Sequence, residues 1–354
     1  MYGFWRRLVR TVSVVVTVLV LIELACFAII TTSIYFIYGQ LREGEPVRYD
    51  AYALYLLKDG IRPTTNNPAA TGPTVPLIWM FGGSTTRGIS DDDSQTMPSF
   101  LAKVLNQEAP VLGAEVVNLG NDGYNSLMET KYLQKMLIDS PVPPRLIVFY
   151  DGANDAAYFA QYRTPQAHHG YRQVRGIIES YHGSFFGMFK SFNAAWYTSY
   201  ARELWDKMRQ GIIPLDPHDP VLHDFARQAA QRYERNAVIA HAFGADYLVI
   251  WQPCWWVESA PVAPVVQARE KKTIIIGDRW AMKENFKTIN TAMAQALQDK
   301  PFFIDLRNAL TSRQQEVYES DGIHLNPHGD ALLARELGKV LKERFAGQWN
   351  RPQP

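Results

Sequence analysis

Serine, histidine and aspartate residues occur in this chain at a spacing that suits acyl transfer. Ser84 follows a glycine pair, and Asp321 lies three residues before His324, close enough to orient its imidazole ring. A serine hydroxyl is nearly unreactive at neutral pH unless a base takes its proton. The sequence therefore predicts Ser84 as a nucleophile, His324 as its general base, and Asp321 as the group that stabilises the imidazolium.

Two segments between these residues contain donors for the oxygen of a tetrahedral intermediate. Gly123 offers a backbone N–H, Asn154 offers a side-chain amide, and the backbone N–H of Ser84 is a third donor. Preorganised donors of this kind form an oxyanion hole. A glycine also permits a positive φ angle in a turn, and this is the explanation we favour for Gly120, whereas Gly123 is expected to be a donor.

The other candidate residues have structural explanations as well. Ser84 can cap a helix in a glycine turn, and His324 can be a buried histidine with hydrogen-bonded ring nitrogens. Asp151 and Asp155 flank Asn154. We expect both aspartates to bind backbone groups of their own turn and to take no part in the chemistry.

The order of these segments resembles the SGNH (GDSL-type) hydrolase superfamily. The resemblance extends from about Pro76 to Phe345 and rests on four blocks, which are Ser84, Gly123, Asn154 and Asp321-x-x-His324. It implies that these residues form the catalytic triad and the oxyanion hole of a serine ester hydrolase or acyltransferase, without a cofactor. The chain reads Gly82-Gly83-Ser84 where the family usually has Gly-Asp-Ser, but that aspartate is not a triad member.

Short apolar runs that alternate with helical stretches predict the elements that position these residues. The apolar runs cover residues 77–81, 114–119, 146–150, 247–251 and 302–306. The helices are expected at 97–106, 126–138, 219–243, 278–298 and 326–345, and Ser126 with Glu129 is interpreted as a capping box. This alternation predicts an α/β fold, namely a three-layer α/β/α, flavodoxin-like parallel sheet of about five strands.

Three of the candidate residues directly follow predicted strands. Ser84, Gly123 and Asn154 come after the first, second and third apolar runs. In open parallel sheets, ligands bind beyond the carboxyl ends of the strands. We therefore expect these residues at one sheet edge, over which the loop with Asp321 and His324 folds.

Aromatic residues suggest a substrate side. Residues 156–217 form an aromatic-rich insertion that we interpret as a cap, and 257–277 form a second irregular segment. Trp255 and Trp256 follow the fourth predicted strand and can stack on a sugar ring or line an acyl slot; packing in the core is the alternative.

An apolar segment near the N-terminus is long enough to cross a membrane as a helix. It extends from Thr11 to Tyr38 and follows Arg6, Arg7 and Arg10. A span needs about 20 residues, and the positive flank predicts the N-terminus inside the cell. We expect an uncleaved single-pass anchor in the inner membrane and an extracytoplasmic catalytic part; a cleaved signal peptide is the alternative.

Glu23 lies within this apolar segment. An acidic residue inside a membrane is costly and suggests either a function or a pairing with another helix. A membrane partner near Glu23 is therefore one possibility.

The predicted organisation follows from these segments. Residues 1–40 form the cytoplasmic tip and anchor, 41–75 a juxtamembrane segment and linker, 76–346 the catalytic domain, and 347–354 a tail. The 36 basic and 35 acidic residues leave a net charge of +1, which provides no general attraction to nucleic acid. Cys26 and Cys254 are not expected to pair, and His168-His169 lacks further ligands for a metal.

The sequence is compatible with two classes of function. The first is an ester hydrolase or acyltransferase outside the cytoplasmic membrane. Its expected substrate is an O-acyl or O-acetyl group of a polysaccharide, with a lipid ester or a thioester as alternatives. The second is an inactive, membrane-tethered component of an envelope polysaccharide system, which Gly83 and Glu23 suggest.

Overall fold

The five predicted apolar runs form one parallel sheet. Its strands are β3 (Leu77–Gly82), β4 (Glu115–Gly120), β5 (Leu146–Asp151), β6 (Asp246–Trp251) and β7 (Phe303–Asp305). They lie in the order β4-β3-β5-β6-β7, and every neighbouring pair is parallel. Numbered along the chain this is the order 2-1-3-4-5 of flavodoxin-like folds. The predicted fold class is confirmed.

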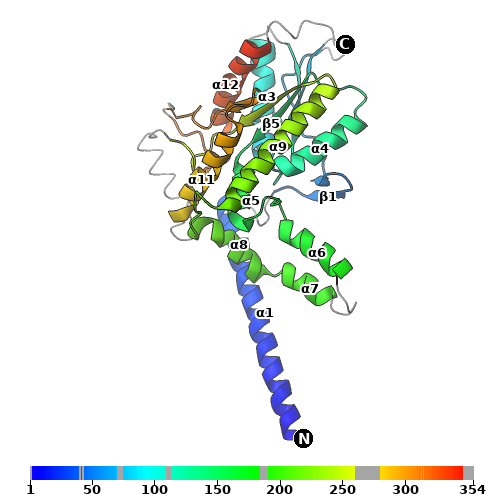
Figure 1. Cartoon of the computed structure of the whole chain (residues 1–354), viewed down its shortest axis with the longest axis vertical. Helices are drawn as coiled ribbons and strands as arrows, with labels where there is room; N and C mark the ends of the chain where they lie inside the picture. Colours follow the sequence, from blue (N-terminus) through cyan, green and yellow to red (C-terminus); the bar gives the residue numbers. More distant parts are fainter. Residues whose placement is uncertain are drawn as a thin grey trace.

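Helices cover both faces of the sheet in the computed structural model (Figure 1). One face packs against α4 (Ser126–Asp139), α9 (Pro220–Ala242) and α11 (Trp280–Leu297), and the other packs against α3 (Met97–Lys103) and α12 (Pro327–Phe345). Strand β3 serves both cores, because Trp79 and Phe81 point to the first face while Ile78 and Met80 point to the second. A strand that is buried on both faces reads as a continuous apolar run, which explains the sequence signal.

The structure describes residues 2–39, 41, 44–69, 75–108, 113–183, 190–259, 280–311, 313 and 315–345. Most of the irregular segment predicted at 257–277, the first residues of the helix predicted at 278–298, and the tail at 347–354 lie outside these ranges. The remaining elements are α1 (Tyr2–Tyr38), the antiparallel hairpin β1 (Val47–Asp50) and β2 (Leu54–Leu57), α2 (Ser84–Arg87), the 3₁₀ turn η1 (Asp93–Gln95), the π-helical turn η2 (Val104–Glu108), α5 (Ala153–Tyr162), α6 (Tyr171–Gly183), α7 (Lys190–Tyr197) and α8 (Tyr200–Ile212).

Three helix starts show how well the local signals predict capping. The side chain of Asp219 accepts a hydrogen bond from Val221 N at the start of α9, as predicted. Asn326 Oδ1 accepts one from Gly329 N at the start of α12. The capping box at Ser126 was a wrong interpretation. Ser126 is the first residue inside α4, and its N and Oγ bind Asp155, 29 positions away.

The carboxyl ends of the three central strands lie level with one another. Gly82 at the end of β3 pairs with Gly120 in β4 and with Tyr150 in β5. Helix α5 starts at this edge and packs against α8, which packs against α1. Helix α12 also starts here and runs toward the end of the domain opposite α1 (Figure 1). The edge that holds the candidate residues is therefore at the α1 end of the molecule.

Among the described residues, α1 is long and apolar enough to cross a membrane, by length and composition. Glu23 in this helix has a partner within the same chain. Its carboxylate accepts hydrogen bonds from Ser199 Oγ at 2.5 Å and from Tyr200 N at 2.7 Å. Glu23 thus reaches the first backbone N–H of α8, where a negative charge is favourable.

Candidate active site

The structure brings the three predicted triad residues together. Ser84 Oγ lies 2.7 Å from His324 Nε2, although 240 positions separate them in the chain. On the other side of the ring, His324 Nδ1 is hydrogen-bonded to Asp321 Oδ2. Imidazole therefore bridges the hydroxyl and the carboxylate, which is the arrangement that nucleophilic catalysis by serine requires.

Backbone hydrogen bonds fix the loop that holds Asp321 and His324. Asp321 Oδ1 accepts from Ile323 N at 2.8 Å and from His324 N at 3.0 Å. The carboxylate therefore binds both the ring and the backbone of the same histidine. This double attachment leaves the ring little freedom to turn away from Ser84.

The charges of the pair support one another. Burial lowers the pKa of His324, but the charge and hydrogen bond of Asp321 outweigh it and hold that pKa above its ordinary value. Burial raises the pKa of Asp321, yet His324 and the two backbone N–H groups bring it below its ordinary value. Asp321 is consequently ionised at neutral pH, which is the form that stabilises an imidazolium.

Asn154 joins the two loops that contain the other predicted donors. Its Nδ2 donates to the carbonyl of Tyr124 at 2.6 Å, directly after Gly123. The same Nδ2 lies so close to Gly83 that a Cβ there would be 2.4 Å from it. The amide therefore sits between the turn of Gly83 and the turn of Gly123, and it donates to Tyr124.

This packing also explains the departure at Gly83. Any side chain at this position would meet the amide of Asn154 and, at 3.0 Å, the carbonyl of Tyr124. The φ angle of Gly83 is −81°, which any residue can adopt. Glycine is therefore needed here for the close approach of Asn154 and not for its backbone conformation. Gly123 differs, since its φ of +74° favours glycine.

The two tryptophans lie beside the histidine loop. Trp256 is buried and donates its indole N–H to the carbonyl of Asp321 at 3.1 Å. Trp255 N donates to Gly322 O at 2.9 Å, and Lys283 lies over the Trp255 ring at 5.1 Å. Both tryptophans therefore support the loop, and the predicted substrate contacts remain a prediction.

A buried ion pair that the sequence did not reveal supports the same loop. Glu258 Oε1 accepts from Arg313 Nη1 at 2.5 Å and from Tyr318 OH at 2.7 Å. Tyr318 also pairs with Leu325, on the other side of the catalytic residues. Glu258 and Arg313 stand 55 positions apart with no motif between them, so no sequence signal connects them.

The two aspartates beside Asn154 bind distant partners. The expectation that they bind their own turn was wrong for Asp151, whereas Asp155 also binds its own backbone N–H. Asp151 accepts a hydrogen bond from Tyr233 OH at 2.7 Å, and Asp155 binds Ser126. Glu129 is fully buried near them, and burial followed by the charge of Asp151 raises its pKa well above the ordinary value. Burial, then the charge of Asp155, raises the pKa of Asp151 to about 7.

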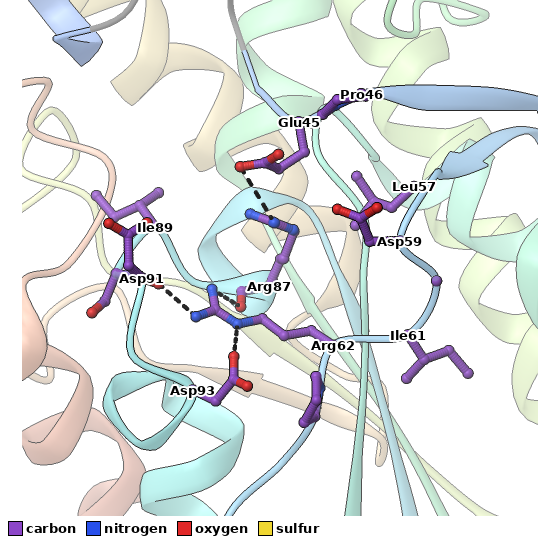
Figure 2. Close-up of a pocket in the computed structure, with 13 residues that line it drawn as sticks. Glu45, Pro46, Leu57, Asp59, Ile61, Arg62, Arg87, Ile89, Asp91 and Asp93 are labelled. Atoms are coloured by element: carbon purple, nitrogen blue, oxygen red, sulfur yellow. Dashed lines mark hydrogen bonds and ion pairs between the residues drawn. The ribbon is translucent and has the colours of Figure 1, made fainter.

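A polar pocket lies one helical turn from the nucleophile (Figure 2). Arg87, the last residue of α2, and Arg62 line it, and six of its thirteen lining residues are charged. Arg62 Nε binds Asp93 at 2.9 Å, while Arg87 faces Glu45 at 3.7 Å. The volume of the pocket is about 230 Å³.

Comparison with protein families gives a match over residues 80–332, to the model of the GDSL-like lipase/acylhydrolase family. This span includes all five candidate residues and most of the chain. The chain belongs to the GDSL-like lipase/acylhydrolase family. It is accordingly a serine ester hydrolase of the SGNH type.

Solved structures of low sequence identity resemble it. The lipase/acylhydrolase from Enterococcus faecalis is 17% identical with a TM-score of 0.42, covering 79% of this chain and 100% of its own. A G-D-S-L lipolytic protein from Veillonella parvula DSM 2008 is 14% identical (TM-score 0.39; 76% and 99%). The acetyl xylan esterase AlAXEase is 12% identical (TM-score 0.41; 75% and 99%). A search of curated proteins found no match.

Proposed function

We propose that Ser84, His324 and Asp321 hydrolyse an ester through an acyl-enzyme. The distance of 2.7 Å between Ser84 Oγ and His324 Nε2 carries this proposal. Ser84 Oγ attacks the carbonyl carbon while Nε2 takes the hydroxyl proton, and the protonated ring then gives that proton to the leaving alcohol oxygen. Water attacks the acyl-enzyme in the same way and releases the acid.

The oxyanion of each tetrahedral intermediate is held by three donors. These are the backbone N–H groups of Ser84 and Gly123 and the second N–H of Asn154. The contacts of Asn154 support this assignment, because its Nδ2 lies against Gly83, next to Ser84, and donates to Tyr124 O, next to Gly123. Preorganised donors stabilise developing charge without reorganisation during the reaction.

The proposed substrate is an O-acyl or O-acetyl group of a polysaccharide outside the cytoplasmic membrane. The charged lining of the pocket beside α2 supports a polar, hydroxyl-rich substrate (Figure 2). The arginines before α1 support an N-terminus inside the cell. The contacts of Glu23 with α8 support retention of α1 as an anchor, since cleavage would remove them.

A lipid ester is the second candidate, and the position of the site favours it. The sheet edge with Ser84 lies at the α1 end of the molecule, where a membrane ester is within reach (Figure 1). A sugar hydroxyl in place of water as the acyl acceptor makes the same machinery a transferase. The inactive alternative fits poorly with a hydroxyl that already contacts its base.

A serine-reactive fluorophosphonate tests the chemistry. We expect labelling of the full chain that disappears in Ser84→Ala and persists in Ser90→Ala, a serine in the pocket region. Ser90 Oγ donates a hydrogen bond to Gln95 Oε1 at 3.2 Å. Labelling that survives in Ser84→Ala, or no labelling of well-folded wild type, contradicts the proposal.

A substrate panel then separates the candidates. Acetate release from acetylated glycans is measured beside hydrolysis of short-chain and long-chain nitrophenyl esters. Turnover of acetylated glycans and short esters supports the polysaccharide, whereas a preference for long chains supports the lipid. Protease accessibility in spheroplasts tests the orientation, because a protected catalytic domain contradicts an extracytoplasmic site.

A further inference from the structure

Helices α6, α7 and α8 expose large apolar side chains near the base of α1; we name these three helices the platform. Phe192 and Trp196 of α7 are 73% and 67% exposed. A concentration of large exposed apolar side chains on neighbouring helices suggests an interaction site. The other large apolar residues exposed on the platform are Ile177, Ile178, Tyr181, Tyr200, Trp205 and Met208.

The platform is a folded unit and not a loosely packed insertion. Arg172 of α6 binds Asp206 of α8 at 2.6 Å, and both side chains are less than 10% exposed. Helix α6 meets α7 closely, because a Cβ on Gly176 would lie 2.1 Å from the Tyr197 ring. The exposed apolar residues therefore belong to helices with fixed positions, and they face outward while other side chains hold the helices together.

The platform is continuous with the membrane helix. Glu23 accepts hydrogen bonds from Ser199 and Tyr200 at the start of α8, and the rings of Phe27 and Tyr200 pack edge to face at 5.1 Å. Figure 1 shows α6, α7 and α8 at the end of the domain from which α1 projects. Whatever surrounds α1 at the level of Glu23 therefore surrounds the start of α8 as well.

The length of α1 sets that level within the bilayer. Counted from Thr11, directly after the last arginine, about 20 residues cross the hydrocarbon and end at Ile30. Ile30 is buried, whereas Tyr35 and Phe36 further along α1 are again more than half exposed. Glu23 lies twelve positions after Thr11, which is about 18 Å into a hydrocarbon layer of about 30 Å. The start of α8 thus falls inside the leaflet on the side of the catalytic domain.

Charge supports the same placement. Residues 171–212 contain six basic and three acidic residues, an excess that the whole chain, with its net charge of +1, does not share. Helices that lie in a membrane interface combine an apolar face with basic residues that attract anionic headgroups. Tryptophan and tyrosine, which are prominent here, favour the same zone.

We propose that the platform is embedded in the lipid leaflet on the side of the catalytic domain, with phospholipid as the occupant of its apolar surface. Glu23 is then buried but satisfied, because the start of α8 provides the donors that hydrocarbon lacks. The inference rests on the proposed retention of α1 as an anchor and does not depend on the ester chemistry.

Depth measurements on the full chain in nanodiscs test this. With Cys26→Ala and Cys254→Ala as background, Phe192→Cys is labelled with an NBD fluorophore. The matched control is Phe243→Cys, because Phe243 is also exposed and caps the C-terminal end of α9, a helix that runs away from the α1 end of the domain (Figure 1). Nanodiscs contain phosphatidylcholine and phosphatidylglycerol, with or without doxyl-labelled lipid.

We expect the label at position 192 to emit at shorter wavelength and to lose most of its intensity with doxyl lipid, while the label at 243 does neither. Long-wavelength emission at position 192, which indicates water around the label, contradicts the proposal. Short-wavelength emission without quenching by doxyl lipid also contradicts it, because it indicates a protein partner or a second copy. Circular dichroism confirms folding, and Trp196→Cys replaces Phe192→Cys if that variant unfolds. Failure of the full chain to enter nanodiscs contradicts the anchor instead.

Discussion

Two sets of buried carboxylates lie near the same sheet edge, and their ionisation differs. Asp321 binds an imidazole and two backbone N–H groups, and its pKa is below the ordinary value. Asp151 lies beside Glu129 and Asp155, and its pKa is raised to about 7. Burial alone favours the neutral form in both places, so the partners decide the outcome.

The difference indicates which carboxylate can do chemistry. A carboxylate that stabilises an imidazolium must remain ionised as the reaction proceeds, and Asp321 meets this condition. The set around Asp151 instead holds α4, α9 and the strand end together, through Tyr233 and Ser126. The raised carboxyl pKa values of Glu129, Asp151 and Asp155 therefore belong to a structural cluster next to the active site.

Substitution of Asp321 should have the largest effect on turnover of all the carboxylates compared. We expect Asp321→Asn to lower kcat by about 10⁴-fold, because the amide favours the wrong tautomer of the ring, as in serine proteases. Asp122→Asn is the matched control, since Asp122 contributes charge near His324 without a hydrogen bond to it. Steady-state hydrolysis of a short nitrophenyl ester measures both. Equal losses in the two variants would show that charge alone matters.

Asn154 lies in the chain between Asp151 and Asp155, and yet we assign the chemistry to its neutral amide. Asn154→Ala should lower kcat by about 10²–10³-fold, the usual cost of one oxyanion donor. Asn125→Ala is the control, because this buried asparagine donates to Ala167 O and lies outside the proposed oxyanion hole. A loss in Asn125→Ala as large as in Asn154→Ala, at equal stability, would argue against the assignment.

The pH dependence of kcat/KM tests the role of Asp321 directly. Hydrolysis needs neutral His324, and Asp321 holds the pKa of this ring above its ordinary value. We therefore expect kcat/KM to fall by about tenfold per pH unit on an acid limb whose midpoint lies above about 6.5, the ordinary histidine pKa. The residual activity of Asp321→Asn should show a limb at lower pH. A wild-type midpoint below the ordinary value would contradict the role given to Asp321.

Asp151→Asn should have the smallest effect on turnover, because Asp151 contacts none of the proposed catalytic groups. Its effect is on stability. Since burial raises the pKa of Asp151 to about 7, the folded state binds the proton more tightly, and the wild type loses stability as pH rises from about 4 to about 7. Over this pH range, the free energy of unfolding of the variant should fall by on the order of 1–3 kcal/mol less than that of the wild type.

Thermal unfolding of the full chain in detergent, measured at pH 4 to 8, tests this. Parallel pH dependence in the wild type and in Asp151→Asn would show that Asp151 does not titrate there. A large loss of turnover at unchanged stability would instead place Asp151 in the reaction and remove the distinction between the two sets.

The sequence predicted the parts of the site that depend on local pattern. Strand ends could be located because β3, β4 and β5 are buried on both faces, and the carboxyl ends of parallel strands share an edge. Ser84, Gly123 and Asn154 were therefore expected together, and the short spacing of Asp321 and His324 fixed the rest of the triad.

Contacts between distant segments could not be predicted in the same way. The pair of Glu258 and Arg313, the bond from Ser126 to Asp155 and the cap that Glu23 provides for α8 each join residues whose spacing has no period. The capping box failed for this reason, because the distant Asp155 binds Ser126 N, which the side chain of Glu129 was expected to bind. Gly83 appeared as a deviation until Asn154 was seen against it.

The carboxylate of Glu23 has a geometric consequence. A flexible linker in place of the Glu23 contacts would let the catalytic domain rotate freely relative to α1, so that it could reach esters at many heights above the proposed anchor. Two hydrogen bonds to one end of α8 instead set the azimuth of the domain on its stalk. With α1 retained as the proposed anchor, every copy would present its nucleophile at one height above the lipid surface, and encounters with substrate would be confined to a thin layer parallel to that surface.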